Sequence, residues 1–252
     1  MNYLDFLGLV ASEEFKAEKY EHVYHQAMEQ LYDYGNIISL FDDLMKEFGR
    51  VPSKTEYVEV GVERAKEFFT SQPTQWLYKE KIHYTFEWNE HLKDAVKARL
   101  GRTYSSYLIE EQVKVYLKSH FNCKIASNQY IDMNFGVDVV VKHEGKLYYI
   151  HIAKNSQASK RMLKEKKNRK SYIPKDGKKC YWTRDWGSAH HLLLFNDVDS
   201  DRMKEINGNL LFDERYLEKY FEELFANADY DLADETSEIW KFKEFLRKNK
   251  IK

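Results

Sequence analysis

Two apolar runs on either side of a two-residue turn say more about the fold of this chain than any other part of its sequence. Residues 137–141 precede the turn at Glu144-Gly145, and residues 146–152 follow it. Both runs are rich in β-branched and aromatic side chains, which favour strands. A glycine-containing turn between two such runs is typical of a β-hairpin. The sequence therefore predicts two paired strands, with Lys154 close to the end of the second.

The segments around this hairpin predict an α/β fold. A helix is expected at residues 106–120, a short strand from residue 123, a basic helix near 158–169 and an apolar strand at 191–195. A strand that follows a crossing helix usually lies parallel to an earlier strand of the same sheet. We therefore expect a mixed central β-sheet flanked by helices.

The rest of the chain is predicted to be helical. Apolar residues recur at helical spacing in residues 1–48, and Gly49 ends the last of these helices. The next helix begins at Ser53-Lys54-Thr55-Glu56, which fits a capping box just after Pro52. Gly101 is interpreted as the end of this helical region. The expected parts are a helical region at 1–100, an α/β core at 101–210 and C-terminal helices at 211–252.

The order of acidic residues, strands and turn resembles a known enzyme family. Glu110 on a helix, Gly136-Val137-Asp138-Val139-Val140, a glycine turn and Tyr149-Ile150-His151-Ile152-Ala153-Lys154 resemble the core of the PD-(D/E)XK nuclease superfamily, over roughly residues 102–200. This superfamily includes restriction enzymes, Holliday-junction resolvases and transposon nucleases. The resemblance implies a restriction-endonuclease-like fold and metal-dependent cleavage of DNA phosphodiester bonds.

The resemblance also implies roles for individual residues. Asp138 and Glu110 or Glu111 match the ligands of Mg²⁺ (or Mn²⁺), and His151 takes the place of the second acidic residue. The family lysine falls on Ala153, so Lys154 serves as the catalytic lysine only where the strand ends or bulges, because a shift of one residue reverses the face. The alternative is that Asp138 caps a strand and Glu110 is a solvated helix residue.

Charge is unevenly distributed, although the net charge is only −1. Residues 160–179 form a concentrated basic run, while residues 1–50 and 213–238 are acidic. Cations placed on phosphates release counterions and bind DNA without base contacts. The run therefore predicts a DNA-binding segment directly after the candidate metal strand, and a solvated helix face is the alternative. Its predicted DNA contacts are Lys160, Arg161, Lys164, Lys167, Arg169 and Lys170.

Composition excludes several other classes of protein. No apolar run approaches the length of a membrane span, and the N-terminus lacks the basic region of a signal peptide. The two cysteines, Cys123 and Cys180, lack metal-ligand spacing and are interpreted as structural. We expect a cytoplasmic protein that makes no contact with a membrane. The helix at 37–48 and the helix that begins at Ser53 are interpreted as a pair that packs against its neighbours, with DNA reading as the alternative.

Three functions stay open at this point. The first is a metal-dependent DNA endonuclease of the restriction, mobile-element or phage type. The second is a catalytically degenerate nuclease-fold protein that binds nucleic acid or a protein without cleaving. The third is a protein-interaction factor, and a homodimer or a protein partner docked on the acidic helices fits any of the three.

Overall fold

The chain folds into two compact units. The computed structural model describes residues 1–28, 37, 39–71, 75–78, 81–84, 86–127, 137–154, 156–157, 159, 190–195 and 201–226. The first unit holds Tyr3–Gln112 and Glu205–Leu211, and the second holds the described parts of Val113–Lys204 and Phe212–Lys252. The division into three parts that the sequence suggested stays a prediction.

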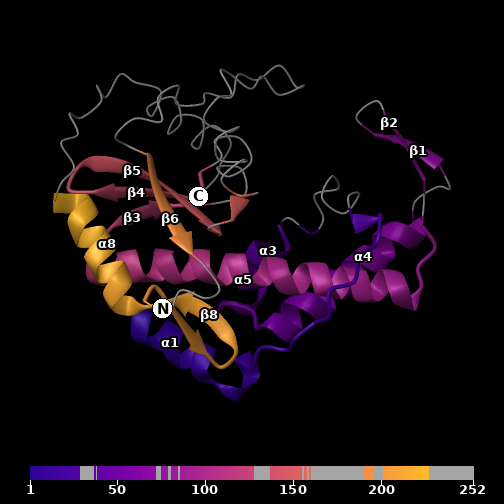
Figure 1. The fold of residues 1–252 in the computed structure, drawn as a ribbon, viewed down its shortest axis with the longest axis horizontal. Helices are drawn as coiled ribbons and strands as arrows, with labels where there is room; N and C mark the ends of the chain where they lie inside the picture. Colours follow the sequence, from indigo (N-terminus) through magenta and orange to yellow (C-terminus); the bar gives the residue numbers. More distant parts are fainter. Residues whose placement is uncertain are drawn as a thin grey trace. The chain divides into compact units, whose positions relative to one another are not determined.

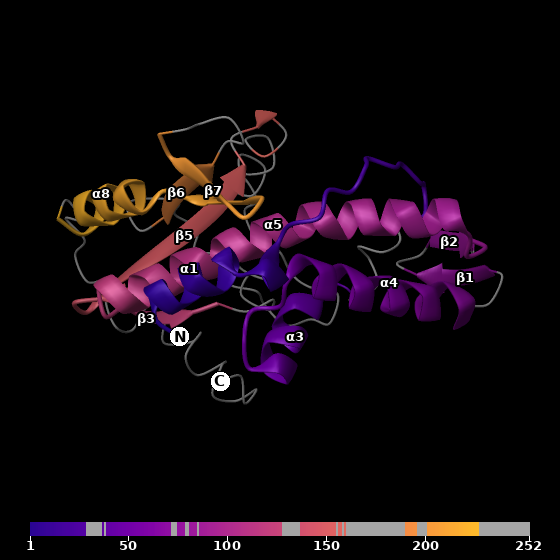
Figure 2. The ribbon, with the colours of Figure 1, turned by 90° about the horizontal axis from the view of Figure 1, so that it is seen from below.

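The first unit is mainly helical. Two of its helices, α4 and the first part of α5, lie side by side (Figure 2). Gly61 marks their close approach, because a Cβ atom there would lie 2.6 Å from Cδ1 of the buried Leu100. The elements are α1 (Tyr3–Ala11), η1 (Glu13–Phe15), α3 (Leu40–Phe48), α4 (Lys54–Ser71), the hairpin β1 (Gln75–Tyr78) and β2 (Lys81–Tyr84), and α5 (Glu90–His120).

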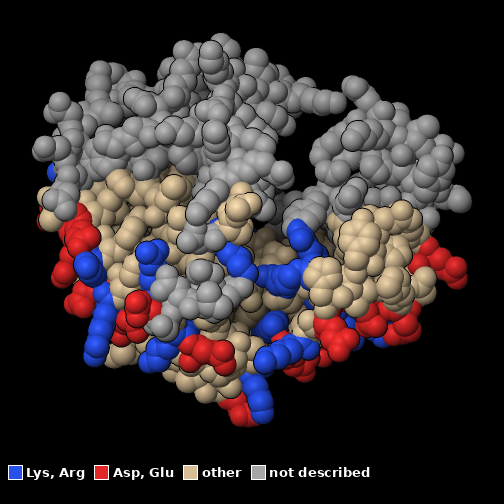
Figure 3. Space-filling model, in the orientation of Figure 1, with Lys and Arg blue, Asp and Glu red and all other residues tan. Residues whose placement is uncertain are grey.

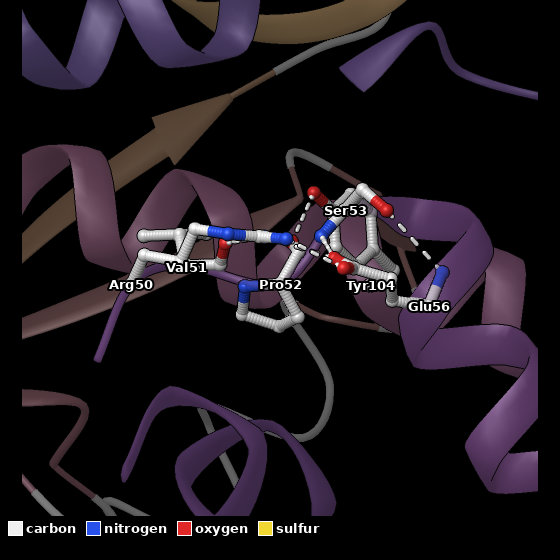
Figure 4. A network of polar contacts seen from close by, with 6 residues as sticks. All are labelled: Arg50, Val51, Pro52, Ser53, Glu56 and Tyr104. Carbon is white, nitrogen blue, oxygen red and sulfur yellow. Dashed lines mark hydrogen bonds and ion pairs between the residues drawn. The ribbon is translucent and has the colours of Figure 1, made fainter. Parts of the chain in front are cut away.

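The connection between α3 and α4 confirms the predicted helix end and capping box. Gly49 adopts a left-handed conformation with φ 66° directly after α3. The Ser53 N–H donates to Glu56 Oε2 at 2.7 Å, and the Glu56 N–H donates to Ser53 Oγ at 3.3 Å. Arg50 donates to both carboxylate oxygens of Glu56 (Figure 4), and this bidentate contact is the main cause that lowers the pKa of Glu56. The two backbone N–H groups that a capping box satisfies therefore both have a hydrogen-bond partner.

Two buried tyrosines meet between α4 and α5, with ring centroids 5.7 Å apart, and they differ in one hydrogen bond. The Tyr104 hydroxyl donates to the Pro52 carbonyl at 3.0 Å (Figure 4). Among the described residues, the buried Tyr57 hydroxyl has no hydrogen-bond partner. An unsatisfied buried hydroxyl destabilises the folded state, whereas a satisfied one contributes to stability.

The two tyrosines should therefore respond in opposite directions to loss of the hydroxyl. Tyr57→Phe is expected to raise the free energy of unfolding by about 1–3 kcal/mol, since it removes an unsatisfied buried group. Tyr104→Phe is expected to lower the free energy of unfolding by about 1–2 kcal/mol, since the Pro52 carbonyl loses the hydrogen bond that the hydroxyl donates. Urea unfolding of both variants beside the wild type measures the difference. Equal effects of the same sign would contradict the conclusion that the Tyr57 hydroxyl lacks a hydrogen-bond partner among the described residues.

A third hairpin consists of β7 (Met203–Ile206) and β8 (Asn209–Phe212), with Asn207 and Gly208 between them. Asn207 and Gly208 both have positive φ, 53° and 78°, as a two-residue type I′ turn requires. The side chain of Asn207 donates to the Ser12 carbonyl at 2.6 Å, and that of the buried Asn209 donates to the Phe15 carbonyl at 2.7 Å. The tip of this hairpin is thus fixed to the residues around η1.

The second unit contains the predicted mixed sheet, in the order β3-β4-β5-β6 (Figure 1). The predicted hairpin is confirmed, because β4 and β5 are antiparallel and the turn residues Glu144 and Gly145 have φ 47° and 85°. β6 is parallel to β5, as expected for a strand reached by a crossover. The strands are β3 (Lys124–Ala126), β4 (Val139–His143), β5 (Lys146–Lys154) and β6 (His190–Phe195).

One face of this sheet forms the core of the second unit. Val139, Val141, Tyr148 and Ile150 are all buried there. A helix, α8 (Glu214–Ala226), lies in the region predicted to hold C-terminal helices. Its Phe225 ring stacks on His143 at 4.2 Å and meets Tyr148 at 5.0 Å. Aromatic side chains of α8 therefore cover this face. None of the described helices is long and apolar enough to cross a membrane.

The predicted helix end at Gly101 is wrong, because α5 runs without interruption from Glu90 to His120. Asn89 caps its start, since the Asn89 side chain accepts the Leu92 N–H at 2.9 Å. Gly101 makes room for a neighbour instead. A Cβ atom at this position would lie 2.6 Å from Cδ2 of Tyr20. The glycine is needed for close packing, so it did not mark a boundary.

Candidate functional site

Asp138 lies directly before β4, against the end of β5. Its carboxylate Oδ2 accepts the Ile152 N–H at 2.5 Å, and its own N–H donates to the Ile150 carbonyl at 3.2 Å. These two hydrogen bonds bracket His151, so Asp138 lies opposite the histidine across the hairpin. The structure therefore brings Asp138 and His151 together. It also shows the strand-capping role that the alternative interpretation gave to Asp138.

The register of β5 decides which of its side chains share the face of His151. Val139 pairs with Ile150, and Ile150 pairs with His191 in the parallel strand. Because successive side chains alternate between faces, Tyr149, His151 and Ala153 lie on one face and Ile150, Ile152 and Lys154 on the other. His151 is only 1% exposed. The position of the family lysine on this face is thus occupied by Ala153.

Lys154 is the last residue of β5, and the pairing of the strand is regular up to that residue. β5 keeps its pairing with β6 through Ile152↔Leu193, Ala153↔Leu194 and Lys154↔Phe195, without a bulge. The Lys154 carbonyl then accepts the Ser156 N–H at 2.8 Å, which begins the turn after the strand. β5 therefore ends at Lys154, as one of the two conditions required, and it has no bulge there. The catalytic role of Lys154 stays a prediction.

Glu110 and Glu111 occupy α5 in the first unit. Glu110 is partly exposed, whereas Glu111 is 6% exposed and precedes the fully buried Gln112, whose side chain donates to the Tyr3 hydroxyl at 3.0 Å. Asp138 belongs to the second unit. The predicted convergence of the helix carboxylates with Asp138 therefore stays a prediction.

The predicted Mg²⁺ (or Mn²⁺) cofactor stays a prediction, because the second unit brings together only Asp138 and His151 of the predicted site among its described residues. Within the described part of the chain, His, Cys, Asp and Glu side chains form no group of three or more that could hold a metal ion. Asp138 already uses one carboxylate oxygen on the Ile152 amide. Its neighbour His151 offers an imidazole, while magnesium prefers oxygen ligands in octahedral geometry.

The basic run that was predicted to bind DNA lies outside the described residues. This applies to the whole predicted set, Lys160, Arg161, Lys164, Lys167, Arg169 and Lys170. The structure does show how the segment before it begins. The Ser156 hydroxyl accepts the Ser159 N–H at 3.1 Å, as an N-cap residue does, and residues 157 and 159 are helical.

The helical pair α3–α4 presents the wrong charge for reading DNA. The exposed side of α4 carries Glu59, Glu63 and Glu67 at intervals of four residues. Negative side chains along a helix repel phosphates, so α4 is unsuited to enter a groove. The preferred interpretation, that this pair packs against its neighbours, agrees with the buried Tyr57 and the close approach at Gly61.

Cys123 is a buried side chain of the second unit. Its Sγ lies 3.6 Å from Nδ1 of His143, and burial raises the pKa of the thiol to about 11. A thiol that stays protonated at neutral pH is a poor nucleophile. The structural interpretation of Cys123 fits this environment, and Cys180 lies outside the described residues.

Two arginines on α5 were missed by the sequence reasoning. Arg99 and Arg102 are three residues apart on a continuous helix, and their charges interact. Residues at this spacing lie side by side on a helix. The signal was present in the sequence, but the helix end predicted at Gly101 placed the two arginines in separate elements.

No family model, curated protein or solved structure matches this sequence.

Proposed function

We propose that this protein binds DNA through a nuclease-like core and does not cleave it by the lysine-assisted route of the PD-(D/E)XK superfamily. The observation that carries this proposal is the unbroken register of β5, which leaves Ala153 beside His151 and turns Lys154 to the opposite face. The fold-level part of the proposal rests on the mixed sheet with its β4–β5 hairpin and on the resemblance of the motif.

The loss of cleavage follows from what the reaction requires. Hydrolysis of a phosphodiester needs charge stabilisation on the phosphate oxygens and an activated water. On the face of His151, the described residues of the β4–β5 hairpin offer one carboxylate that already caps a strand, an imidazole and an alanine methyl group. This set lacks both the second carboxylate and the lysine of the family pattern.

The DNA-binding part of the proposal rests on the basic run at residues 160–179. It follows β5 in the chain, a few residues after Lys154. Lysines and arginines at this density bind phosphates in a salt-dependent way that needs no base contacts. The acidic side of α4 leaves that helix out of the DNA interface.

A second candidate is the metal-dependent endonuclease itself, with Mg²⁺ or Mn²⁺ as cofactor. The observation in its favour is that Asp138 lies opposite His151, where the family places its two metal-binding side chains. This candidate also requires Glu110 or Glu111 as a further ligand and a cation other than Lys154 near the cleaved bond.

A plasmid-nicking assay separates the two candidates. The wild type is expected to leave supercoiled plasmid intact with magnesium or manganese while still shifting labelled duplex in a gel. The variant His151→Glu with Ala153→Lys restores the family pattern on one face of β5 and is expected to nick in magnesium. Adding Asp138→Ala should abolish that gain.

The same nicking assay can also contradict the proposed loss of cleavage. Wild-type nicking that disappears in Asp138→Ala, while DNA binding is kept, would establish the endonuclease instead. Lys154→Ala is the matched control, since its side chain lies on the other face. It should change neither binding nor nicking in the restored variant.

A further inference from the structure

Two lysines lie directly opposite each other across the β3–β4 pair. Lys124 and Lys142 are partners in the antiparallel register, so both side chains belong to the same face of the sheet. Lys124 is exposed and Lys142 is half-buried. Like charges directly opposite each other on neighbouring strands destabilise a sheet. The chain therefore keeps two positive charges at a position where they oppose folding.

Neither lysine is neutralised within the described part of the chain. No ion pair or hydrogen bond joins either ammonium group to a carboxylate there. Other lysines of the second unit do have partners, since Lys219 forms an ion pair with the glutamate one turn later, and Lys146 and Lys154 of β5 each take part in an interaction. On the face drawn in Figure 3, Lys and Arg side chains (blue) lie interspersed with Asp and Glu side chains (red) along the lower half. The charges of Lys124 and Lys142 are thus available to an anionic partner.

The lysine pair lies on the sheet face that also carries His151. Lys142 pairs with Leu147 of β5, and His151 lies four residues further along that strand on the same side. Four residues of a strand span about 13 Å. The opposite face is the one that α8 covers, where the Phe225 ring stacks on His143. The two lysines therefore share a face with the candidate site and not with α8.

We propose that Lys124 and Lys142 bind backbone phosphates of duplex DNA on the sheet face of His151. This inference rests on the proposed DNA-binding function and adds a contact that is separate in sequence from the run at 160–179. Neighbouring strands lie about 4.8 Å apart, and each ammonium group is carried on a flexible four-carbon stem. The two groups can therefore converge on one phosphate or reach two consecutive ones. A phosphate bound between them also offsets their mutual repulsion.

The test measures folding stability and DNA affinity on the same variants. Lys142→Glu places a carboxylate directly opposite Lys124, so it is expected to raise the thermal unfolding midpoint by about 1–3 °C. The same variant should bind a 20-base-pair duplex about tenfold more weakly at 50 mM salt. A gain in stability together with a loss of affinity is the result expected of a charge pair kept for binding.

The salt dependence of binding counts the phosphate contacts. The double variant Lys124→Gln with Lys142→Gln should make the slope of log K against log salt shallower by about 1.8, since each lost contact accounts for about 0.9. Lys142→Arg keeps the charge and should keep the slope. The matched control is Lys219→Glu, an exposed lysine of α8 whose reversal changes the net charge as much as Lys142→Glu does. This control should leave the slope unchanged.

The outcomes separate this inference from the proposed function. A wild type that binds duplex, with an equal slope for the double glutamine variant, overturns the lysine site and leaves DNA binding intact. A wild type that does not bind duplex at 50 mM salt overturns both. A lowered unfolding midpoint in Lys142→Glu together with weaker binding would assign Lys142 a structural role and also overturn the site.

Discussion

Reversal of Lys164, Lys167 and Lys170 to Glu is expected to weaken DNA binding strongly and equally for all duplex sequences. Each lost phosphate contact makes the slope of log K against log salt shallower by about 0.9, so three lost contacts reduce it by about 2.7. Binding isotherms between 50 and 200 mM salt, on two duplexes of unrelated sequence, measure it.

A matched control has the same change in net charge elsewhere. Lys16, Lys66 and Lys219 are exposed lysines, and each pairs with a glutamate of its own element or the element next to it. Reversing these three lysines to Glu should weaken DNA binding only through the more negative net charge of the protein. The slope of log K against log salt should change little. Equal losses in both triple variants would remove the run at 160–179 from the interface. A third possibility, that the run meets an acidic protein surface, predicts no duplex binding in any variant.

Phe221→Ala is expected to lower the free energy of unfolding by about 3–5 kcal/mol. Phe221 is fully buried on α8, with its ring 6.3 Å from both Tyr116 and Phe121 and 5.9 Å from Phe225. Truncation leaves a cavity among aromatic rings that cannot close around a methyl group. Urea unfolding followed by fluorescence and by circular dichroism measures the loss.

The control for this prediction lies on the same unit. Leu192 of β6 is 43% exposed, so Leu192→Ala removes little buried surface and should cost under about 1 kcal/mol. A cost for Phe221→Ala no greater than that of Leu192→Ala would show that α8 does not cover the sheet as described. DNA binding per folded molecule should stay unchanged in both variants, since neither side chain is cationic.

Local signals in the sequence determined much of the second unit. The runs around Glu144-Gly145 predicted β4 and β5, because alternating faces and a left-handed turn are properties of neighbouring residues. The capping box at Ser53 and Glu56 followed from a spacing of three residues, and α8 from its amphipathic pattern. The mixed sheet followed from the rule that a crossover connects parallel strands.

The same reasoning predicted only part of the candidate site. Asp138 and His151 were placed together because both belong to one hairpin. Whether Lys154 could share their face depended on a strand end or a bulge at that residue. Pairing with β6, more than thirty residues later in the chain, keeps β5 regular through Lys154↔Phe195. A contact so distant in sequence leaves no local signal.

The sequence by itself therefore determined the elements, their turns and the types of residue available for chemistry. Tertiary structure decided which face each residue occupies and what each glycine is for. Glycine is a residue type that often ends a helix. At Gly101, however, the ring of Tyr20 from a distant segment fills the space beside the glycine, and α5 continues. That continuity makes neighbours of Arg99 and Arg102. The physical reason is that packing between distant segments outweighs the modest propensity of a single residue.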